Sequence, residues 1–118
     1  MSSAQRFINV KTVYDVAVVR LKTKRVDPQN FEQVAQELYA LVDRDERKRI
    51  LLCLTDVEYV YSTALVRLQT FEKKVQEAGG ELRLCNLEPA VSELFDVTHL
   101  DKVFDIEKDE RAALDAFW

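Results

Sequence analysis

The first part of the chain follows a strand-like pattern of apolar and polar residues. Residues 7–14 (FINVKTVY) and 16–22 (VAVVRLK) are rich in Val and Ile, which favour strands. Tyr14 and Asp15 lie between these segments and predict a tight hairpin turn. We therefore expect the domain to begin with an antiparallel pair of strands.

Apolar residues at helical spacing predict two longer helices. One is expected over 28–44, with Asp27 as its N-cap and Pro28 as its first residue. The other is expected over 62–78 and ends at the Gly79-Gly80 pair. The inward stripes are Phe31, Val34, Ala35, Leu38, Leu41 and Val42 in the first helix, and Ala64, Leu65, Leu68, Phe71, Val75 and Ala78 in the second.

Further short strands are expected between and after these helices. The continuous apolar run at 49–56 (RILLCLTD) is typical of a strand covered on both faces, and a hinge is expected after it. Strands are also expected at 81–87 and 102–106, with a short helix between them at 88–97. A terminal helix follows, with Asp109 or its neighbour as the N-cap.

The predicted order of elements is β-β-α-β-α-β-α-β-α. A strand–helix–strand unit that occurs three times requires right-handed crossovers and a mostly parallel sheet. A length of 118 residues suits one domain of ordinary size. We expect a single α/β domain over 1–118, with a mixed sheet of about four or five strands, an antiparallel N-terminal hairpin and about four helices.

Composition and charge disfavour several classes of function. The formal net charge is −4 and no basic stripe is present, so we expect no nucleic-acid partner. No segment reaches the ~20 apolar residues of a membrane span, and the N-terminus has no apolar signal region. These features predict no membrane partner and a cytoplasmic location. Cys53 and Cys85 lie in apolar runs, which predicts buried free thiols, and we expect neither a metal site nor a cofactor.

The loops after the predicted parallel strands are the expected place for a functional site. The carboxyl ends of such strands meet at one edge of a sheet, where ligands and partners bind. Three loops, at 22–28, 56–62 and 86–89, should meet at this edge. The residues expected in this neighbourhood are Asp27, Asp56, Tyr61, Ser62, Thr63, Asn86 and Glu88.

These loops contain no recognisable catalytic constellation. Asp56 ends a central strand, as the phosphorylated aspartate of a receiver domain does, but the acidic pair and the lysine that this chemistry needs are missing. His99 is a single histidine away from any obvious nucleophile. We therefore expect no enzymatic activity and no catalytic residue.

Ser62 and Thr63 stand where the second long helix should begin, and two interpretations stay open. In the first, Ser62 is the N-cap and stabilises the helix by ~1 kcal/mol. In the second, the hydroxyl is a site of phosphorylation, because the free amides and dipole of a helix N-terminus stabilise a phosphate. Added charge there would disrupt a partner surface by repulsion and desolvation.

Three segments together carry a resemblance to a known family. They are the strand RILLCLTDVEYV, the following YSTAL, and the stretch FEKKVQEAGGELRLCNLEPAVSELFDVTHLDKVFDI. YSTAL stands where the STAS family has a D-S-S-G-L type motif. In these features, residues 7–116 resemble a STAS domain of the anti-anti-sigma factor type.

This resemblance implies transcription regulation by partner switching. In the family, the unphosphorylated domain binds an anti-sigma factor of the serine-kinase type, frees the sigma factor, and is inactivated when the kinase phosphorylates its serine. The family's phosphoacceptor matches Ser62, its following serine matches Thr63, and an aspartate that helps the partner contact matches Asp27. The chain departs from the pattern in having Tyr61 for an aspartate, Ala64 for a glycine, and no glycine in the loop KTKRVD.

Two hypotheses from different classes follow. In the first, the chain is an anti-sigma factor antagonist that binds a serine-kinase anti-sigma factor and is switched by phosphorylation at Ser62. Its expected partner-binding residues are Asp27, Tyr61, Ser62 and Arg67. In the alternative, the domain is a non-phosphorylated structural or adaptor subunit that assembles with other STAS or sensor domains.

Two further expectations concern side chains outside the loops. Arg67, Glu72 and Lys74 are expected on or beside the exposed face of the second long helix, available for electrostatic matching with a partner. For Phe117 and Trp118, packing on the domain and contact with a partner both stay open.

Overall fold

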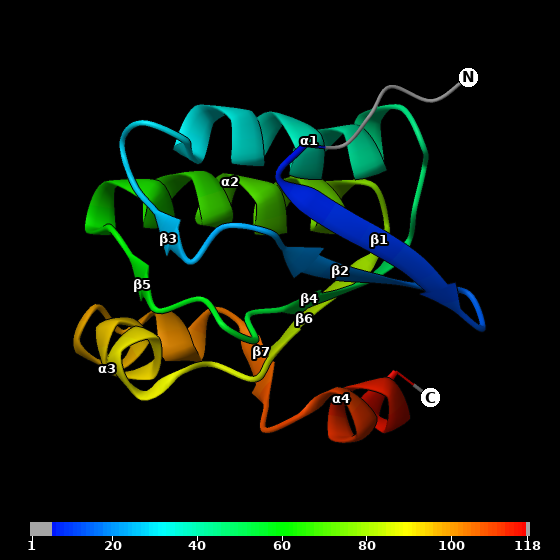
Figure 1. Ribbon diagram of the computed structural model, residues 1–118. Helices are drawn as coiled ribbons and strands as arrows, with labels where there is room; N and C mark the ends of the chain where they lie inside the picture. Colours follow the sequence, from blue (N-terminus) through cyan, green and yellow to red (C-terminus); the bar gives the residue numbers. More distant parts are fainter. Residues whose placement is uncertain (1–5, 118) are drawn as a thin grey trace.

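The computed structural model describes residues 6–117, in which a five-stranded mixed sheet is covered by helices (Figure 1). The strands lie in the order β1-β2-β4-β6-β7, where β1 pairs antiparallel with β2 and all other neighbours are parallel. Their bounds are β1 (Ile8–Val13), β2 (Val16–Leu21), β4 (Arg49–Cys53), β6 (Glu81–Cys85) and β7 (Asp105–Glu107). The predicted α/β fold with an antiparallel N-terminal hairpin is confirmed.

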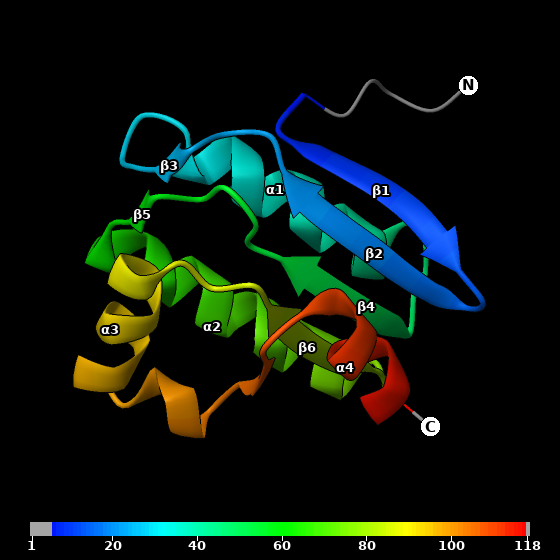
Figure 2. The same cartoon turned by 60° about the horizontal axis from the view of Figure 1, so that its bottom comes forward.

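Helices cover both faces of this sheet. The helical elements of the described residues are α1 (Phe31–Asp43), α2 (Ser62–Glu77), α3 (Pro89–Val97), the short 3-10 helix η1 (Leu100–Lys102) and α4 (Glu110–Ala116). Figures 1 and 2 show α1 and α2 side by side on one face, with α4 on the opposite face. The predicted helix–strand alternation is therefore realised as a three-layer domain.

The central strand β4 is buried on both faces because its side chains alternate between two cores. Ile50 and Leu52 belong to the large core beneath α1 and α2. Leu51 and Cys53 belong to a smaller core beneath α4, which also contains Phe117. This arrangement confirms the interpretation of the continuous apolar run as a strand covered on both sides.

A second, two-stranded sheet lies at the carboxyl-end edge of the main sheet. It consists of β3 (Arg25–Val26) and β5 (Tyr59–Val60), which pair in parallel near the starts of α1 and α2 (Figure 1). Val26 and Val60 are both buried and anchor the pair on the large core. The sequence predicts only a hinge after β4, so this small sheet is a finding of the structure.

The first helix begins later than the sequence predicts. The predicted start at Pro28 is wrong, because α1 begins at Phe31 and Asn30 occupies the N-cap position. Asp27 instead closes a turn before the helix. Its carboxylate accepts hydrogen bonds from the backbone N–H groups of Gln29 at 2.9 Å and Asn30 at 3.2 Å. Asp27 thus stabilises the turn that leads into the helix, and its carbonyl oxygen also accepts a hydrogen bond from the Phe31 N–H at 2.9 Å.

The two glycines end α2 as predicted, for two different reasons. Gly79 has φ of +80°, a conformation that residues with a Cβ rarely adopt. Gly80 lies so close to the backbone carbonyl of Lys48 that a Cβ would collide with it. The first glycine permits the turn, and the second permits the close approach to the segment that leads into β4.

The last part of the chain also differs in detail from the prediction. The strand expected at 102–106 is shifted to β7, because η1 occupies the residues before it. Asp109 caps α4 as predicted, since its Oδ1 accepts a hydrogen bond from the Ala112 N–H at 2.8 Å. Phe117 is buried in the core beneath α4, so it packs on its own domain. Trp118 lies outside the described residues.

Candidate functional site

The pairing of β3 and β5 brings two of the predicted site loops together. Val26 pairs with Val60, and the Tyr61 N–H donates a hydrogen bond to the Val26 carbonyl oxygen at 2.9 Å. Asp27 directly follows Val26, and Ser62 directly follows Tyr61. The structure therefore brings the loops at 22–28 and 56–62 together, as the topology predicts.

Asn30 fixes the loop that carries Asp27. Its Oδ1 accepts from the Asp27 N–H at 3.0 Å, and its Nδ2 donates to the Arg25 carbonyl at 2.8 Å and to the Thr23 hydroxyl at 3.2 Å. The amide side chain therefore uses both its donor and its acceptor groups within the loop. Sequence reasoning missed this residue, although an Asp and an Asn three positions apart are typical of turns closed by their side chains.

Ser62 is the first residue of α2 and is exposed, as is Thr63. The N-cap position belongs to Tyr61, whose backbone is extended with φ −68° and ψ 145° and whose side chain makes no capping hydrogen bond. The prediction that Ser62 is the N-cap is wrong, because Tyr61 must stay extended to pair with β3 and the helix begins one residue after it. The Ser62 hydroxyl is therefore not used to cap the helix.

Exposed aromatic and apolar residues stand on either side of this serine in the sequence. The rings of Tyr59 and Tyr61 meet edge to face, with centroids 5.2 Å apart and an interplanar angle of 85°. Their exposed fractions are 39% and 37%, and Val66, one helical turn after Ser62, is 60% exposed. Exposed tyrosines of this kind are enriched at protein–protein interfaces. Sequence reasoning did not single out Tyr59 or Val66, although Val66 lies in the predicted helix outside its inward stripe.

Arg67 lies between the two long helices rather than on a free face. Its guanidinium pairs with the Glu32 carboxylate and lies over the Phe31 ring, 5.6 Å from the centroid. The Tyr39 hydroxyl donates to the Arg67 carbonyl at 3.2 Å. The side chain is still 36% exposed, so part of it remains accessible beside α1.

The two other charged residues expected beside the exposed face differ from each other. Lys74 is half-buried and bonds the Asp43 carboxylate at 3.0 Å, which ties α2 to the end of α1. Glu72 is buried, with only 8% of its surface exposed, so its predicted place on or beside the exposed face is wrong. Burial raises the pKa of Glu72, and the charge of Asp105 adds to this effect, whereas a hydrogen bond from Gln76 opposes it.

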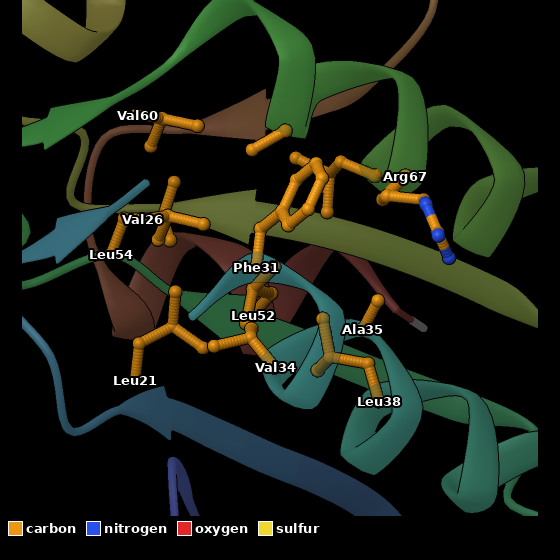
Figure 3. Close-up of a pocket in the computed structure, with 12 residues that line it drawn as sticks. Leu21, Val26, Phe31, Val34, Ala35, Leu38, Leu52, Leu54, Val60 and Arg67 are labelled. Atoms are coloured by element: carbon orange, nitrogen blue, oxygen red, sulfur yellow. The ribbon is translucent and has the colours of Figure 1, made fainter. Parts of the chain in front are cut away.

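An apolar cavity of about 30 Å³ lies beneath the small sheet, between α1 and α2. Figure 3 shows Phe31 amid aliphatic side chains such as Val26 and Leu52, with the Arg67 guanidinium turned away from them. A space of this size holds about one or two water molecules at most, and its lining offers them few polar partners. It is therefore a packing void rather than a binding site for a metabolite.

The other predicted site residues form a second group next to the first. Asp56, Glu58 and Glu88 line a shallow hollow together with Lys24. Asp56 has φ of +68°, and Asn86, in the neighbouring loop, has φ of +60°. Both residues belong to types that tolerate the left-handed conformation, so tight turns account for their presence at the strand ends.

The described residues offer neither a cluster for a metal ion nor a helix that could span a membrane. Within residues 6–117, no three His, Cys, Asp or Glu side chains are grouped so that they could hold a metal ion. No helix in the same part of the chain combines the length and the apolar character needed to cross a membrane. His99 is exposed at the start of η1.

Comparison with known proteins agrees with this geometry. The family model of the STAS domain matches residues 7–113. BtrV, a candidate anti-sigma factor antagonist of Bordetella bronchiseptica, is 36% identical over 92 residues, which cover 78% of each chain. The anti-sigma-B factor antagonist of Bacillus subtilis strain 168 is 38% identical over 82 residues, which cover 69% of this chain and 72% of that one.

A solved structure supports the same relationship. An anti-sigma-factor antagonist (STAS) domain protein from Planctomyces limnophilus superimposes with a TM-score of 0.84 and 27% identity, covering 92% of this chain and 96% of the other. Because the family model spans nearly the whole described chain and relatives above 30% identity cover more than two thirds of it, the chain belongs to the STAS domain family.

Proposed function

We propose that the protein is an anti-sigma factor antagonist that binds an anti-sigma factor of the serine-kinase type and is switched by phosphorylation of Ser62. The names of its relatives in Bordetella bronchiseptica and Bacillus subtilis support the regulatory role. The observation that carries the proposal is the exposed Ser62 hydroxyl at the first turn of α2, which serves no capping role. A kinase can therefore reach this hydroxyl without unfolding the helix.

The proposed partner-binding surface consists of Asp27, Tyr61, Ser62 and the exposed part of Arg67. The hydrogen bond between the β3 and β5 segments keeps the first three of these close together. Tyr61 offers a partly exposed ring, and Arg67 offers a cation at the seam between the helices. Tyrosine and arginine are the residue types that often carry most of the energy of a protein interface.

A phosphate on Ser62 would change this surface without disrupting the fold. Phosphorylation adds a charge of about −1.5 to −2. The free amides and the dipole of the α2 N-terminus would stabilise that charge on the domain itself. A partner surface that fits the neutral hydroxyl and the tyrosine ring would instead meet a solvated dianion, so its binding would weaken.

Phosphosite mapping tests the proposal. The protein is purified from its source cells, incubated with ATP and the copurified kinase fraction, and then mapped for phosphate. The expected result is one phosphate on Ser62, which disappears in Ser62→Ala and persists in the matched variant Thr63→Ala. A phosphate that moves to Thr63 would place the switch one residue later. An unmodified protein in the presence of an active anti-sigma kinase would contradict the switch.

A second function is supported by the exposed Tyr59–Tyr61 pair. Tyr61 stands where the family motif has an aspartate, so a constitutive aromatic interface could serve a non-phosphorylated adaptor that assembles with other STAS or sensor domains. In that case Ser62→Asp would leave assembly intact, whereas Tyr61→Ala would weaken it. Size-exclusion chromatography of the native complex with each variant distinguishes the two functions.

A further inference from the structure

Two cysteines face each other beneath α4, on the opposite side of the sheet from α1 and α2. Cys53 ends β4 and Cys85 ends β6, and the two residues are direct partners in the parallel ladder. Their sulfur atoms are 3.3 Å apart, and both residues are free thiols with no exposed surface. The sequence predicts buried free thiols, but not that they meet.

The backbone geometry of this pair is compatible with a disulfide. Neighbouring strands lie about 4.8 Å apart, and disulfides join Cα atoms separated by about 4.4 to 6.8 Å. The sulfur atoms would have to approach from 3.3 Å to about 2.05 Å, which small rotations of the two side chains can supply.

The environment makes the two thiols chemically different. The Cys85 thiol donates a hydrogen bond to the Cys53 sulfur, which lowers the pKa of Cys53 and raises the pKa of Cys85. The Glu110 carboxylate, 3.8 Å from the Cys53 sulfur, raises the pKa of Cys53. Arg20 binds Glu110 at 3.2 Å, and its positive charge lowers the pKa of Cys53. Cys53 is therefore the better nucleophile, and Cys85 is placed to attack it afterwards.

Access to the pair depends on α4. Ala113 and Phe117 belong to the same core as the thiols, and the Glu110 carboxylate of α4 lies 3.8 Å from the Cys53 sulfur. Figure 2 shows α4 lying across this face of the sheet. A helix of 7 residues is not stable without tertiary packing. Its docking relies on that packing, on the Arg83 guanidinium 5.3 Å from the Phe117 ring, and on the ion pairs of Glu110 with Lys11 and Arg20. Local opening of α4 is therefore easier than global unfolding.

We propose that Cys53 and Cys85 form an oxidant-responsive dithiol, which a hydroperoxide converts to an intramolecular disulfide when α4 lifts from the sheet. The Cys53 thiolate attacks one peroxide oxygen, the O–O bond breaks, and the leaving oxygen takes a proton to give water or an alcohol. Cys85 then attacks the sulfenic sulfur, the S–O bond breaks, and the second oxygen leaves as water with the proton of Cys85. The two thiols lose two electrons in total, and the peroxide gains them.

Treatment of the folded full chain with hydrogen peroxide, followed by non-reducing peptide mapping, tests the proposal. The expected product is a monomer with a Cys53–Cys85 bridge that dithiothreitol reverses. In Phe117→Ala, the bridge should form roughly tenfold faster, because the reaction is limited by local opening of α4. Val66→Ala, on the other face of the domain, is the matched control and should leave the rate unchanged.

Cys85→Ser and Cys53→Ser complete the test. With Cys85→Ser, peroxide should leave a sulfenic acid on Cys53 that dimedone traps, whereas Cys53→Ser should react more slowly. A chain that stays fully reduced, while the same peroxide oxidises both thiols of the urea-unfolded protein, would overturn the proposal. Bridges between two molecules, or sulfinic acids without an intramolecular bridge, would overturn it as well.

Discussion

The backbone N–H of Tyr61 donates a hydrogen bond to the carbonyl oxygen of Val26 at 2.9 Å. This bond continues the β3–β5 pairing by one residue and joins the loop of Asp27 to the first turn of α2. It also keeps Tyr61 extended, so the helix begins at Ser62 and leaves the serine hydroxyl exposed. The proposed switch thus depends on a sheet of only two short strands.

Replacing Asn30 should destabilise the loop that carries Asp27. Asn30→Ala removes one acceptor and one donor group that hold Thr23, Arg25 and Asp27 in place, which should lower the free energy of unfolding by about 1–3 kcal/mol. Urea denaturation measures the change. The neighbouring substitution Gln29→Ala is the control and should stay within about 0.5 kcal/mol, because that side chain is exposed.

Ser62→Ala should have little effect on stability. Its hydroxyl does not cap α2, and alanine favours the helix, so the free energy of unfolding should change by less than about 0.5 kcal/mol. Asp109→Ala offers a matched comparison, because Asp109 does cap a helix and its loss should cost about 1 kcal/mol. Thermal denaturation of the two variants separates the cases. A loss of about 1 kcal/mol in Ser62→Ala would restore the capping interpretation.

The main elements could be predicted because their apolar patterns are long. The run RILLCLTD specifies a doubly covered strand, and the stripe through Leu65 and Phe71 specifies a helix, whatever the rest of the chain does. The Gly79-Gly80 pair likewise marks a helix end by local geometry.

The small sheet and the start of each helix could not be predicted in the same way. A strand of two residues has no period, and the pairing of Val26 with Val60 becomes visible only when distant segments meet. That pairing moves the N-cap of α2 from Ser62 to Tyr61, and the bonds of Asn30 delay the start of α1. The candidate site was found by the topological rule for strand ends, whereas its local geometry depends on these long-range contacts.

Glu72 should make the stability of the domain depend on pH. Its pKa is raised by burial in the folded state, so the folded protein binds this proton more tightly than the unfolded chain does. The resulting stabilisation is fully present below the unfolded carboxyl pKa of about 4.3 and is lost as the pH rises through the higher folded value. At pH 7, the free energy of unfolding of Glu72→Gln should therefore exceed that of the wild type by about 1 kcal/mol.

Denaturation of Glu72→Gln between acid and neutral pH checks this prediction. The variant's excess in free energy of unfolding over the wild type should shrink as the pH falls from the raised folded pKa of Glu72 towards the unfolded value of about 4.3. Glu77→Gln, five residues further along α2 and exposed, is the control and should stay within about 0.5 kcal/mol of the wild type. An advantage of Glu72→Gln that is constant across this range would show that titration of Glu72 is not linked to folding.

The two glycines after α2 should differ in their tolerance of alanine. Gly79→Ala places a side chain at positive φ in open space, which should cost about 1 kcal/mol. Gly80→Ala forces a Cβ against the Lys48 backbone, so the expected cost is higher, about 2–3 kcal/mol. Equal losses in urea denaturation would indicate that the segment before β4 moves aside freely.

The effect of phosphorylation on partner binding is measured by calorimetry, as the affinity of the copurified anti-sigma factor for the protein with and without phosphate on Ser62. Gln69→Asp, which adds a charge to the same helix away from the first turn, provides the control. The phosphate should weaken binding at least roughly tenfold, or about 1.4 kcal/mol, and the control should bind like the wild type. Equal affinities of the phosphorylated and unmodified proteins would contradict the account.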